Sequence, residues 1–231
     1  MPPARQIEDE WLDHLPGDDP RAIRARRDLR RINALMLQAG VMARLLKDNC
    51  DSPPRRIIDL GAGDGTFMLR VVRRLPRPAQ ETEIVLADQR AIVAEETGAG
   101  FRALGYRPVL TENDIFTCLE RTGPADVICA NLFLHHFTEP QLQRLFALAA
   151  RKTRVFVACE PRRAPFSMVA SRLLWAIGCN DVTRHDAAAS VRAGFAGPEL
   201  SALWPSGEPW QLTEHAARLF THCFIANRSG P

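Results

Sequence analysis

The sequence predicts an α/β fold with a mostly parallel sheet that is wound with helices. Three observations support this class. Short apolar runs typical of buried strands alternate with helical patterns between residues 57 and 160, an order that places parallel strands in one sheet. Residues 57–67 read IIDLGAGDGTF, a strand, a glycine-rich turn and the start of a helix. Two strand-like runs at residues 210–214 and 219–227 are close enough in sequence to form an antiparallel hairpin.

Length and composition fit one such domain with added segments. The chain has 231 residues, and its 46% hydrophobic content is enough to fill a core. The net charge of +3 does not argue for a polyanionic partner. Acidic residues within 8–19 precede arginines within 21–31, which we interpret as a solvated helix face and not a nucleic-acid site. No residue pattern indicates an oligomeric state.

Targeting signals and metal motifs are also missing from the sequence. The N-terminus has no apolar signal region, and no stretch approaches the ~20 apolar residues of a membrane span, so we expect a cytoplasmic protein. The six cysteines form no Cys-x-x-Cys pair, and no histidine stands at metal-ligand spacing. We therefore expect reduced, mostly buried thiols and no metal site.

The individual elements follow in order along the chain. Residues 20–46 carry apolar side chains at three- and four-residue spacing, which predicts a helical segment before the first strand. A helix follows the glycine turn and stops at Pro76, and Thr138 with Gln141 forms a capping box for a later helix. The remaining expected elements are strands at 83–88, 107–111, 126–134 and 154–160, helices at 91–104 and 165–177, and a short helix that ends at Gly194 after the segment 180–186.

The glycine turn is the first candidate ligand site. Gly61, Gly63 and Gly65 lack Cβ atoms, so they can adopt positive φ and let a ligand lie against the backbone. A dinucleotide fingerprint, G-x-G-x-x-G, would need a third glycine where this chain has Thr66. The spacing here is G-x-G-x-G, with Asp59 two residues before the first glycine.

Two further carboxylates follow at the ends of later strands. Asp88 ends the second strand, where a carboxylate can accept both hydroxyls of a ribose. Asp114 follows the third strand in the run ENDIF. Each has an ordinary structural alternative: Asp59 could accept N–H groups of the turn, Asp88 could cap a helix, and Asp114 could stabilise a turn.

The order of these motifs resembles class I S-adenosylmethionine-dependent methyltransferases, and the resemblance implies their Rossmann-like sheet and their cofactor. Asp59 would then reach the methionine ammonium, Asp88 the ribose, Asp114 the adenine N6 group, and the N–H of Ile115 adenine N1. The cofactor-binding residues implied by the resemblance are Asp59, Gly61, Ala62, Gly63, Gly65, Asp88, Gln89, Asp114, Ile115, Asn131 and Leu132. The resemblance further implies a helical cap from residues 1–50, a domain from 51–231 and a substrate lid at 161–200.

Residues 131–137, NLFLHHF, carry the candidate catalytic groups. Enzymes of this family that methylate amino groups of adenine or glutamine often have Asn or Asp, two prolines and an aromatic residue here, whereas Leu-His-His resembles enzymes acting on quinones and aromatic polyketides. His135 and His136 are the first candidates for a general base, with His185 in the lid next. Because adjacent residues leaving a strand point in opposite directions, we expect one of the pair to face the pocket. Glu160, at the end of the fifth strand, could orient a base or the substrate.

The leading hypothesis is methyl transfer to a small aromatic or phenolic acceptor, most simply at oxygen. C-methylation of a quinone-like ring uses the same cofactor motifs and remains open. A scaffold that binds the cofactor without turnover also remains open. An oxidoreductase using NAD is the rival enzyme class, and Thr66, Asp114 and the terminal hairpin speak against it.

Overall fold

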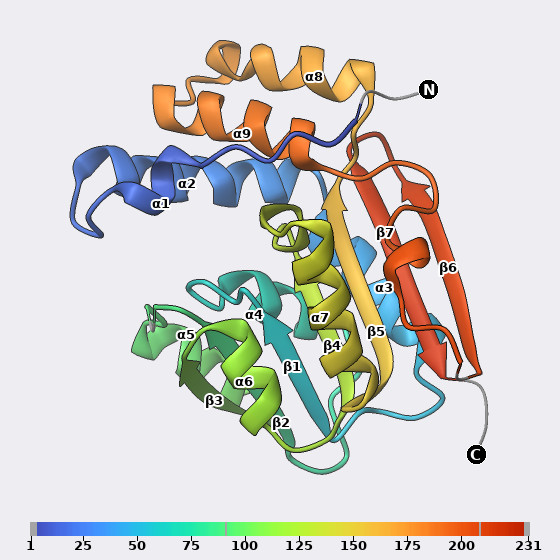
Figure 1. The fold of residues 1–231 in the computed structure, drawn as a ribbon. Coiled ribbons are helices and arrows are strands. Elements are labelled where there is room, and N and C mark those ends of the chain that lie inside the picture. The colour runs from blue at the N-terminus through green and yellow to red at the C-terminus, as the bar shows by residue number, and fades with distance from the viewer. Residues whose placement is uncertain (1–3, 91, 208, 229–231) are drawn as a thin grey trace.

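The computed structural model describes residues 4–90, 92–207 and 209–228, which form a seven-stranded sheet flanked by helices (Figure 1). The strand order is β3-β2-β1-β4-β5-β7-β6. Strands β1 to β5 are parallel, and β7 runs antiparallel to both β5 and β6. The bounds are β1 (Arg56–Leu60), β2 (Thr82–Asp88), β3 (Tyr106–Glu112), β4 (Ala125–Asn131), β5 (Thr153–Pro161), β6 (Trp210–Ala217) and β7 (Thr221–Arg228). The predicted mostly parallel sheet with a terminal hairpin is confirmed.

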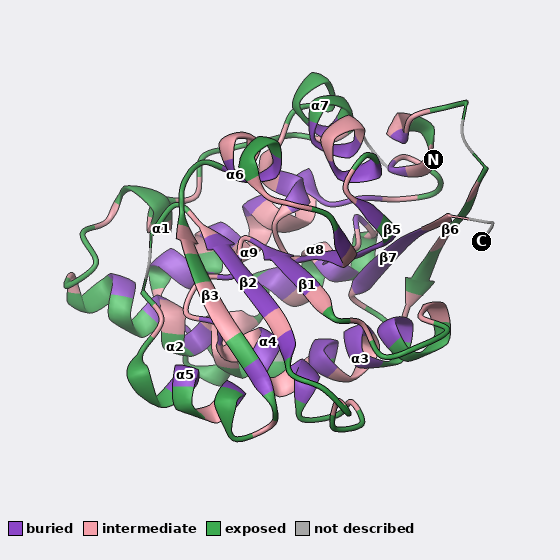
Figure 2. Cartoon of the chain, turned by 90° about the horizontal axis from the view of Figure 1, so that it is seen from below, coloured by how far each residue is buried: buried purple, intermediate pink, exposed green. Residues whose placement is uncertain are grey.

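Helices cover both faces of the sheet, and the central strands are buried between them (Figure 2). Alternate residues of β1 serve opposite faces, as the two-residue period of a strand requires. Ile57 packs in one cluster with Met42 and Met68, and Ile58 in the other with Phe146. The first face carries α3 (Gln38–Asn49), α4 (Thr66–Val72) and α5 (Glu95–Arg102), and the second carries α6 (Ile115–Arg121) and α7 (Glu139–Ala150).

A layer of helices lies beyond the carboxyl ends of the parallel strands (Figure 1). It contains α1 (Trp11–His14), α2 (Pro20–Leu35), α8 (Pro165–Arg172) and α9 (Asp181–Ala193). Buried carboxylates join these segments, which are far apart in the sequence. Asp28 of α2 accepts the backbone N–H of Asn180 at 3.0 Å, and Asp186 of α9 accepts that of Trp11 at 2.8 Å. We call this layer the roof.

The apolar pattern at residues 20–46 does not form one helix, which corrects the sequence expectation. Leu37 adopts a left-handed φ of 55° and separates α2 from α3. The two halves of the pattern bury against different partners, since α2 contacts α9 in the roof while α3 contacts α4 and β5. A straight helix could not reach both, so tertiary packing overrides the local period.

The segment after β4 also differs from the expectation. The strand stops at Asn131 instead of continuing to residue 134, and Leu134–His136 form a short 3-10 helix, η1. Leu132 makes the bend with a left-handed φ of 51°. A buried carboxylate, Glu160, accepts the backbone N–H groups of the turn and so replaces the hydrogen bonds that a continued strand would have made.

Two expectations for the lid region are also corrected. The helix expected at 165–177 ends at Arg172 and is followed by a separate 3-10 turn, η2 (Leu174–Ile177). Residues 181–186, which were expected to precede the next helix, form the first half of α9. Part of the apolar side of α8 and η2 is exposed.

Within the described residues, no helix is long and apolar enough to cross a membrane. All six cysteines are unpaired, and five of them are buried.

Candidate active site

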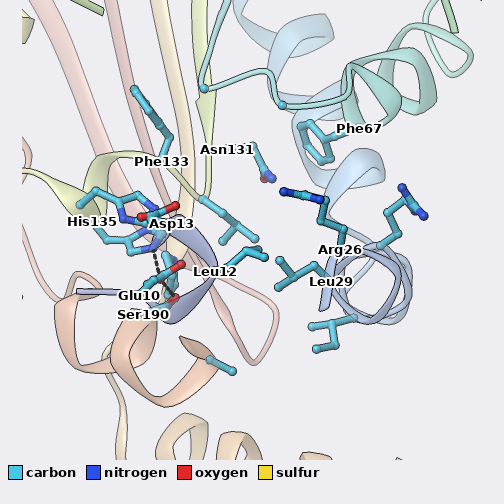
Figure 3. A pocket seen from close by; sticks show the side chains of 18 of the residues that line it. Glu10, Leu12, Asp13, Arg26, Leu29, Phe67, Asn131, Phe133, His135 and Ser190 are labelled. Atoms are coloured by element: carbon cyan, nitrogen blue, oxygen red, sulfur yellow. Dashed lines mark hydrogen bonds and ion pairs between the residues drawn. The ribbon is translucent and has the colours of Figure 1, made fainter. Parts of the chain in front are cut away.

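A cavity of about 780 Å³ lies between the carboxyl ends of β1, β2 and β4 and the roof (Figure 3). Doubly wound sheets place their ligands at this edge, because the loops there diverge to opposite faces. The cavity is lined by the glycine turn, by the residues that follow β2 and β4, and by the inner sides of α2, α8 and α9. Its volume lies within the usual range for small-molecule sites, roughly 300–1,000 Å³.

The glycine turn has the predicted backbone. Gly61, Gly63 and Gly65 all have positive φ, at 69°, 56° and 71°. A Cβ on Gly61 would lie 2.2 Å from the ring of Phe133, whereas a Cβ on Gly63 would meet nothing within 4 Å. Close packing therefore requires glycine at position 61, and the backbone conformation favours it at position 63.

Two buried acceptors face the cavity beside this turn. Asp59 is 2% exposed, and the contact described for its carboxylate is the Cys129 thiol at 3.7 Å. Burial, with a smaller contribution from the negative charge of Asp88, raises the pKa of Asp59 to about 7. Asn131 Oδ1 is buried without a hydrogen-bond donor among the described residues. Both groups line the cavity, so a ligand that carries several N–H donors, such as a primary ammonium, would satisfy them.

Asp88 lines the cavity and holds the loops around it. Its Oδ2 accepts the N–H of Gly63 at 2.8 Å and its Oδ1 accepts the N–H of Arg90 at 3.0 Å. A carboxylate has about four acceptor sites, so each oxygen keeps one for a ligand. Gln89 lines the cavity beside it.

Asp114 does not line the cavity, although its neighbours Asn113 and Ile115 do. Its Oδ1 caps α6 by accepting the N–H groups of Phe116 and Thr117 at 3.0 and 3.1 Å. Asp114 therefore caps a helix, where the alternative from the sequence was a turn, and the adenine contact stays a prediction.

Glu160 is fully buried and organises the turn after β4. Its Oε1 accepts the N–H groups of Phe133 and Leu134 at 3.0 and 2.9 Å. Its Oε2 accepts the N–H of His135 at 3.3 Å and lies 2.8 Å from Nδ1 of the same residue. This carboxylate therefore fixes the His135 ring, and the role of Glu160 in orienting a base stays a prediction.

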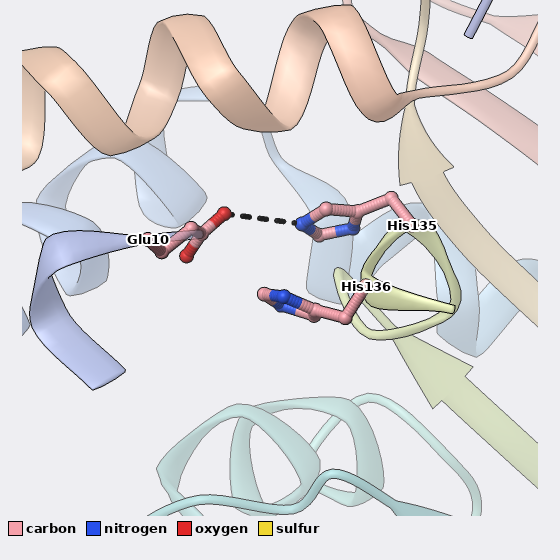
Figure 4. Close-up of side chains that lie close together, drawn as sticks. All are labelled: Glu10, His135 and His136. Carbon is pink, nitrogen blue, oxygen red and sulfur yellow. Dashed lines mark hydrogen bonds and ion pairs between the residues drawn. The ribbon is translucent and has the colours of Figure 1, made fainter. Parts of the chain in front are cut away.

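Glu10, from the N-terminal segment, meets the two histidines (Figure 4). Its Oε1 lies 3.4 Å from Nε2 of His135 and accepts a hydrogen bond from Ser190. The rings of His135 and His136 lie 4.2 Å apart and are tilted by 33°. Both line the cavity, so the expectation that one would point away is wrong. Successive residues of a 3-10 helix are rotated by roughly 120°, not by the half-turn of a strand.

The charges of this cluster are strongly coupled. Burial disfavours the protonated form of His135, but the carboxylates of Glu10 and Glu160 outweigh it and raise the pKa of His135 to about 9. Burial and the nearby charge of His135 lower the pKa of His136. Burial raises the pKa of Asp13, which lines the cavity close by. The two carboxylates of Glu10 and Glu160 thus lie on either side of one ring, His135, and favour its protonated form.

His185 does not belong to this cluster. Its ring stacks on Trp11 with centroids 4.0 Å apart, and its Nδ1 lies 3.0 Å from Asp186 Oδ1. The described cavity lining does not include it. His185 therefore contacts other residues of the roof, Trp11 and Asp186.

Sequence reasoning missed the residues that the roof brings to the cavity. Glu10 and Asp13 fall in an acidic run that was interpreted as solvated surface, and Arg30 in a solvated arginine face. Arg30 instead reaches down from α2 to Asp64 of the glycine turn at 2.9 Å. No local pattern marks these residues, because their partners are distant in the sequence.

Comparisons with known proteins agree with this architecture. The plantazolicin methyltransferase BpumL, solved with SAH, superimposes with a TM-score of 0.66 at 14% identity, covering 91% of each chain. The pyocyanin biosynthetic protein PhzM gives 0.62 at 17% identity and an O-methyltransferase family protein from Burkholderia thailandensis 0.58 at 19%. This chain spans 62% and 61% of their lengths. No family model and no curated protein sequence matches the chain. These likenesses show the fold, a Rossmann-like methyltransferase sheet.

Proposed function

We propose that this protein transfers a methyl group from S-adenosylmethionine to an oxygen of a small aromatic molecule. One observation carries the proposal. A single cavity is lined by two buried acceptors suited to an ammonium, Asp59 and Asn131, and by a histidine pair suited to a hydroxyl, His135 and His136. The methyltransferase fold of the chain supports this interpretation.

The residues around the glycine turn fit the cofactor. The ammonium of its methionine half would donate to Asp59 and Asn131 Oδ1, and the turn at Gly61, Ala62, Gly63 and Gly65 would let that half lie against the backbone. The ribose hydroxyls would use the remaining acceptor sites of Asp88. The adenine end would reach Ile115 and, in our proposal, Asp114.

The rest of the cavity suits a flat apolar acceptor. The polar side chains in this part include His135 and His136, with Glu10, Asp13 and Ser190 close to them. A phenol ionises near pH ~10, so a group that takes up its proton or stabilises the phenolate aids O-methylation. The apolar side chains of the cavity lining include Leu12, Leu29, Leu174, Val191 and Phe220.

Alignment would supply most of the catalysis. The sulfonium is already an activated methyl donor, so the acceptor oxygen must be held in line with the methyl carbon. Good orientation can contribute ~7–11 kcal/mol, whereas a positioned base contributes ~10²–10⁴-fold, or roughly 3–5 kcal/mol. The roof and the glycine turn together would provide this alignment.

The first test is thermal unfolding with S-adenosylmethionine, S-adenosylhomocysteine or NAD(H). A ligand at 100 times its dissociation constant adds ~2.7 kcal/mol of stability, which raises the midpoint by roughly 5–10 °C for a chain of this size. We expect a shift with the adenosyl ligands alone. A shift with NAD(H) alone would overturn the proposal in favour of an oxidoreductase.

The second test follows a radiolabelled methyl group into a panel of phenols and hydroquinones. Label on oxygen is expected, and label on a ring carbon would replace O-methylation by C-methylation at the same site. Cofactor binding without methylation of any acceptor in the panel would favour the scaffold alternative.

A further inference from the structure

Three side chains beside the acceptor part of the cavity converge on one point (Figure 4). A ligand atom from each of Glu10, His135 and His136 lies within 4.8 Å of the other two. Glu10 and His135 are 125 residues apart in the sequence, so no spacing motif announces this group. Two imidazoles with one carboxylate are a donor set found at zinc sites that keep an open position.

The separation of Glu10 from His135 indicates what lies between them. Nδ1 of His135 is committed to Glu160, so Nε2 faces Oε1 of Glu10 across 3.4 Å. Charge-assisted N–H···O bonds are shorter, ~2.7–2.9 Å. Two ligands held ~2.0–2.1 Å from a tetrahedral metal lie roughly 3.3 Å from each other. The observed distance therefore fits the edge of such a site as well as it fits a long ion-pair contact.

Neighbouring groups orient two of the three side chains, His135 and Glu10. Glu160 lies 2.8 Å from Nδ1 of His135, and a carboxylate in that position fixes the ring of a metal-bound histidine with Nε2 toward the ion. Backbone N–H groups hold Glu160 itself in place. Ser190 donates to Glu10, which sets the carboxylate against the cavity.

We propose that Glu10, His135 and His136 bind one divalent transition-metal ion, for which Zn²⁺ is the best chemical match. Imidazole and carboxylate ligands in this number suit zinc, whose fourth position would open to the cavity that all three residues line. Binding of the ion does not depend on the proposed methyl transfer. The assignment of the acceptor oxygen as the fourth ligand rests on the proposed methyl transfer.

The ion would act on the acceptor in one step before methyl transfer. Glu10, His135 and His136 would hold the ion, and the ion would make an acceptor hydroxyl in its open position easier to ionise. The proton would pass to the Asp13 carboxylate in the same cavity wall. The oxygen lone pair would bond to the methyl carbon as the carbon–sulfur bond breaks, and the electron pair of that bond would stay on sulfur in a neutral thioether.

The test is equilibrium dialysis of the chelator-treated full-length chain against Zn²⁺, without acceptor. We expect saturable binding of one ion per chain. Glu10→Gln and His136→Asn should each lower Zn²⁺ affinity by at least ~100-fold, more than the loss typical of a residue behind the ligands. The matched controls are Glu8→Gln, in the same acidic segment but paired with Arg192, and His215→Asn, exposed on β6; both should bind as the unaltered chain does.

A second measurement does not depend on the variants. Co²⁺ added to the unaltered chain should give the intense visible absorption of a four-coordinate ion, and excess Zn²⁺ should remove it. A weak six-coordinate spectrum, no saturable binding, or equal losses in the control variants would each overturn the metal site.

Binding of S-adenosylhomocysteine, measured in the same samples, separates the two proposals. If the chain binds S-adenosylhomocysteine but does not bind Zn²⁺, the metal site alone is overturned. Zn²⁺ binding without binding of either adenosyl ligand would overturn the proposed methyl transfer and leave the metal site standing.

Discussion

Glu160 and His135 form one buried unit, with Oε2 of the carboxylate 2.8 Å from Nδ1 of the ring. The same carboxylate accepts the backbone N–H groups of Phe133 and Leu134. Glu160, at the end of β5, thus sets both the position of the His135 ring and the conformation of the turn after β4. Disturbing that side chain should affect both together.

Replacing Glu160 by Gln should lower the free energy of unfolding by about 3 kcal/mol, because the amide NH₂ would face buried N–H groups that need an acceptor. Urea unfolding measures the loss. The control is Glu120→Gln, whose exposed carboxylate pairs with Arg144 and should change stability by less than about 0.5 kcal/mol. Equal effects of the two variants would contradict a special role for Glu160.

Affinity for S-adenosylhomocysteine should depend on pH through Asp59. In our proposal the ligand's ammonium binds the ionised carboxylate, but burial raises the pKa of Asp59 to about 7, so binding below that pH must first remove a proton. The dissociation constant should therefore rise by about tenfold for each pH unit below 7. Calorimetric titration from pH 5 to 8 checks this. Asp59→Asn should bind more weakly with no such dependence, and a flat profile for the unaltered chain would refute the assignment.

The same shift affects the ligand-free protein with a definite sign. The folded pKa of Asp59 lies above its ordinary value of 3.8, so between pH 3.8 and about 7 the folded state keeps a proton that the unfolded state has released. This carboxylate should therefore reduce stability as pH rises through that window. Comparing the pH dependence of urea unfolding for Asp59→Asn and the unaltered chain isolates its contribution, and identical profiles would argue against the shift.

Two alanine substitutions in the glycine turn should have different consequences. Gly61→Ala places a methyl group 2.2 Å from the ring of Phe133, so the ring must move and cofactor binding should be lost. Gly63→Ala meets no protein atom within 4 Å, so its cost in stability is only the strain of a left-handed φ, about 1–2 kcal/mol. Thermal unfolding without ligand distinguishes the two variants, and titration with S-adenosylhomocysteine checks the loss of binding in Gly61→Ala. If Gly61→Ala were as stable as Gly63→Ala, the packing argument would be wrong.

The Arg30–Asp64 pair links the roof to the glycine turn across 2.9 Å. Both side chains are partly exposed, so a double-mutant cycle with alanine should give a coupling energy for unfolding of at most about 1 kcal/mol. Since both residues line the cavity, Arg30→Ala should weaken cofactor binding by more than this small stability loss implies. Arg27→Ala, on the exposed side of α2, is the control and should leave binding unchanged.

The backbone of the glycine turn and the positions of the carboxylates beside it are predictable because their signals are local. Gly61, Gly63 and Gly65 announce a turn with positive φ wherever the chain leaves a strand. Asp59 and Asp88 end neighbouring strands, and the carboxyl ends of parallel strands meet at one edge of the sheet. The alternation of Ile57 and Ile58 and the terminal hairpin likewise depend on near neighbours in the sequence.

Long-range contacts decided the rest. The bend at Leu37 exists because α2 and α3 bury against different layers, which no helical period reveals. His135 and His136 both line the cavity because the chain turns after β4, and Glu160, 25 residues after His135, accepts the backbone N–H groups of that turn.

Glu10 shows most clearly what the sequence does not predict, the partner of a charged side chain. Its acidic neighbours predict a solvated surface, yet the roof carries it to His135 and Ser190 inside the cavity. Backbone conformation and burial period are properties of short segments, so the residues of each segment specify them. The partner of a charge depends on how whole layers pack, and here that packing alone joined the carboxylate to the histidine pair.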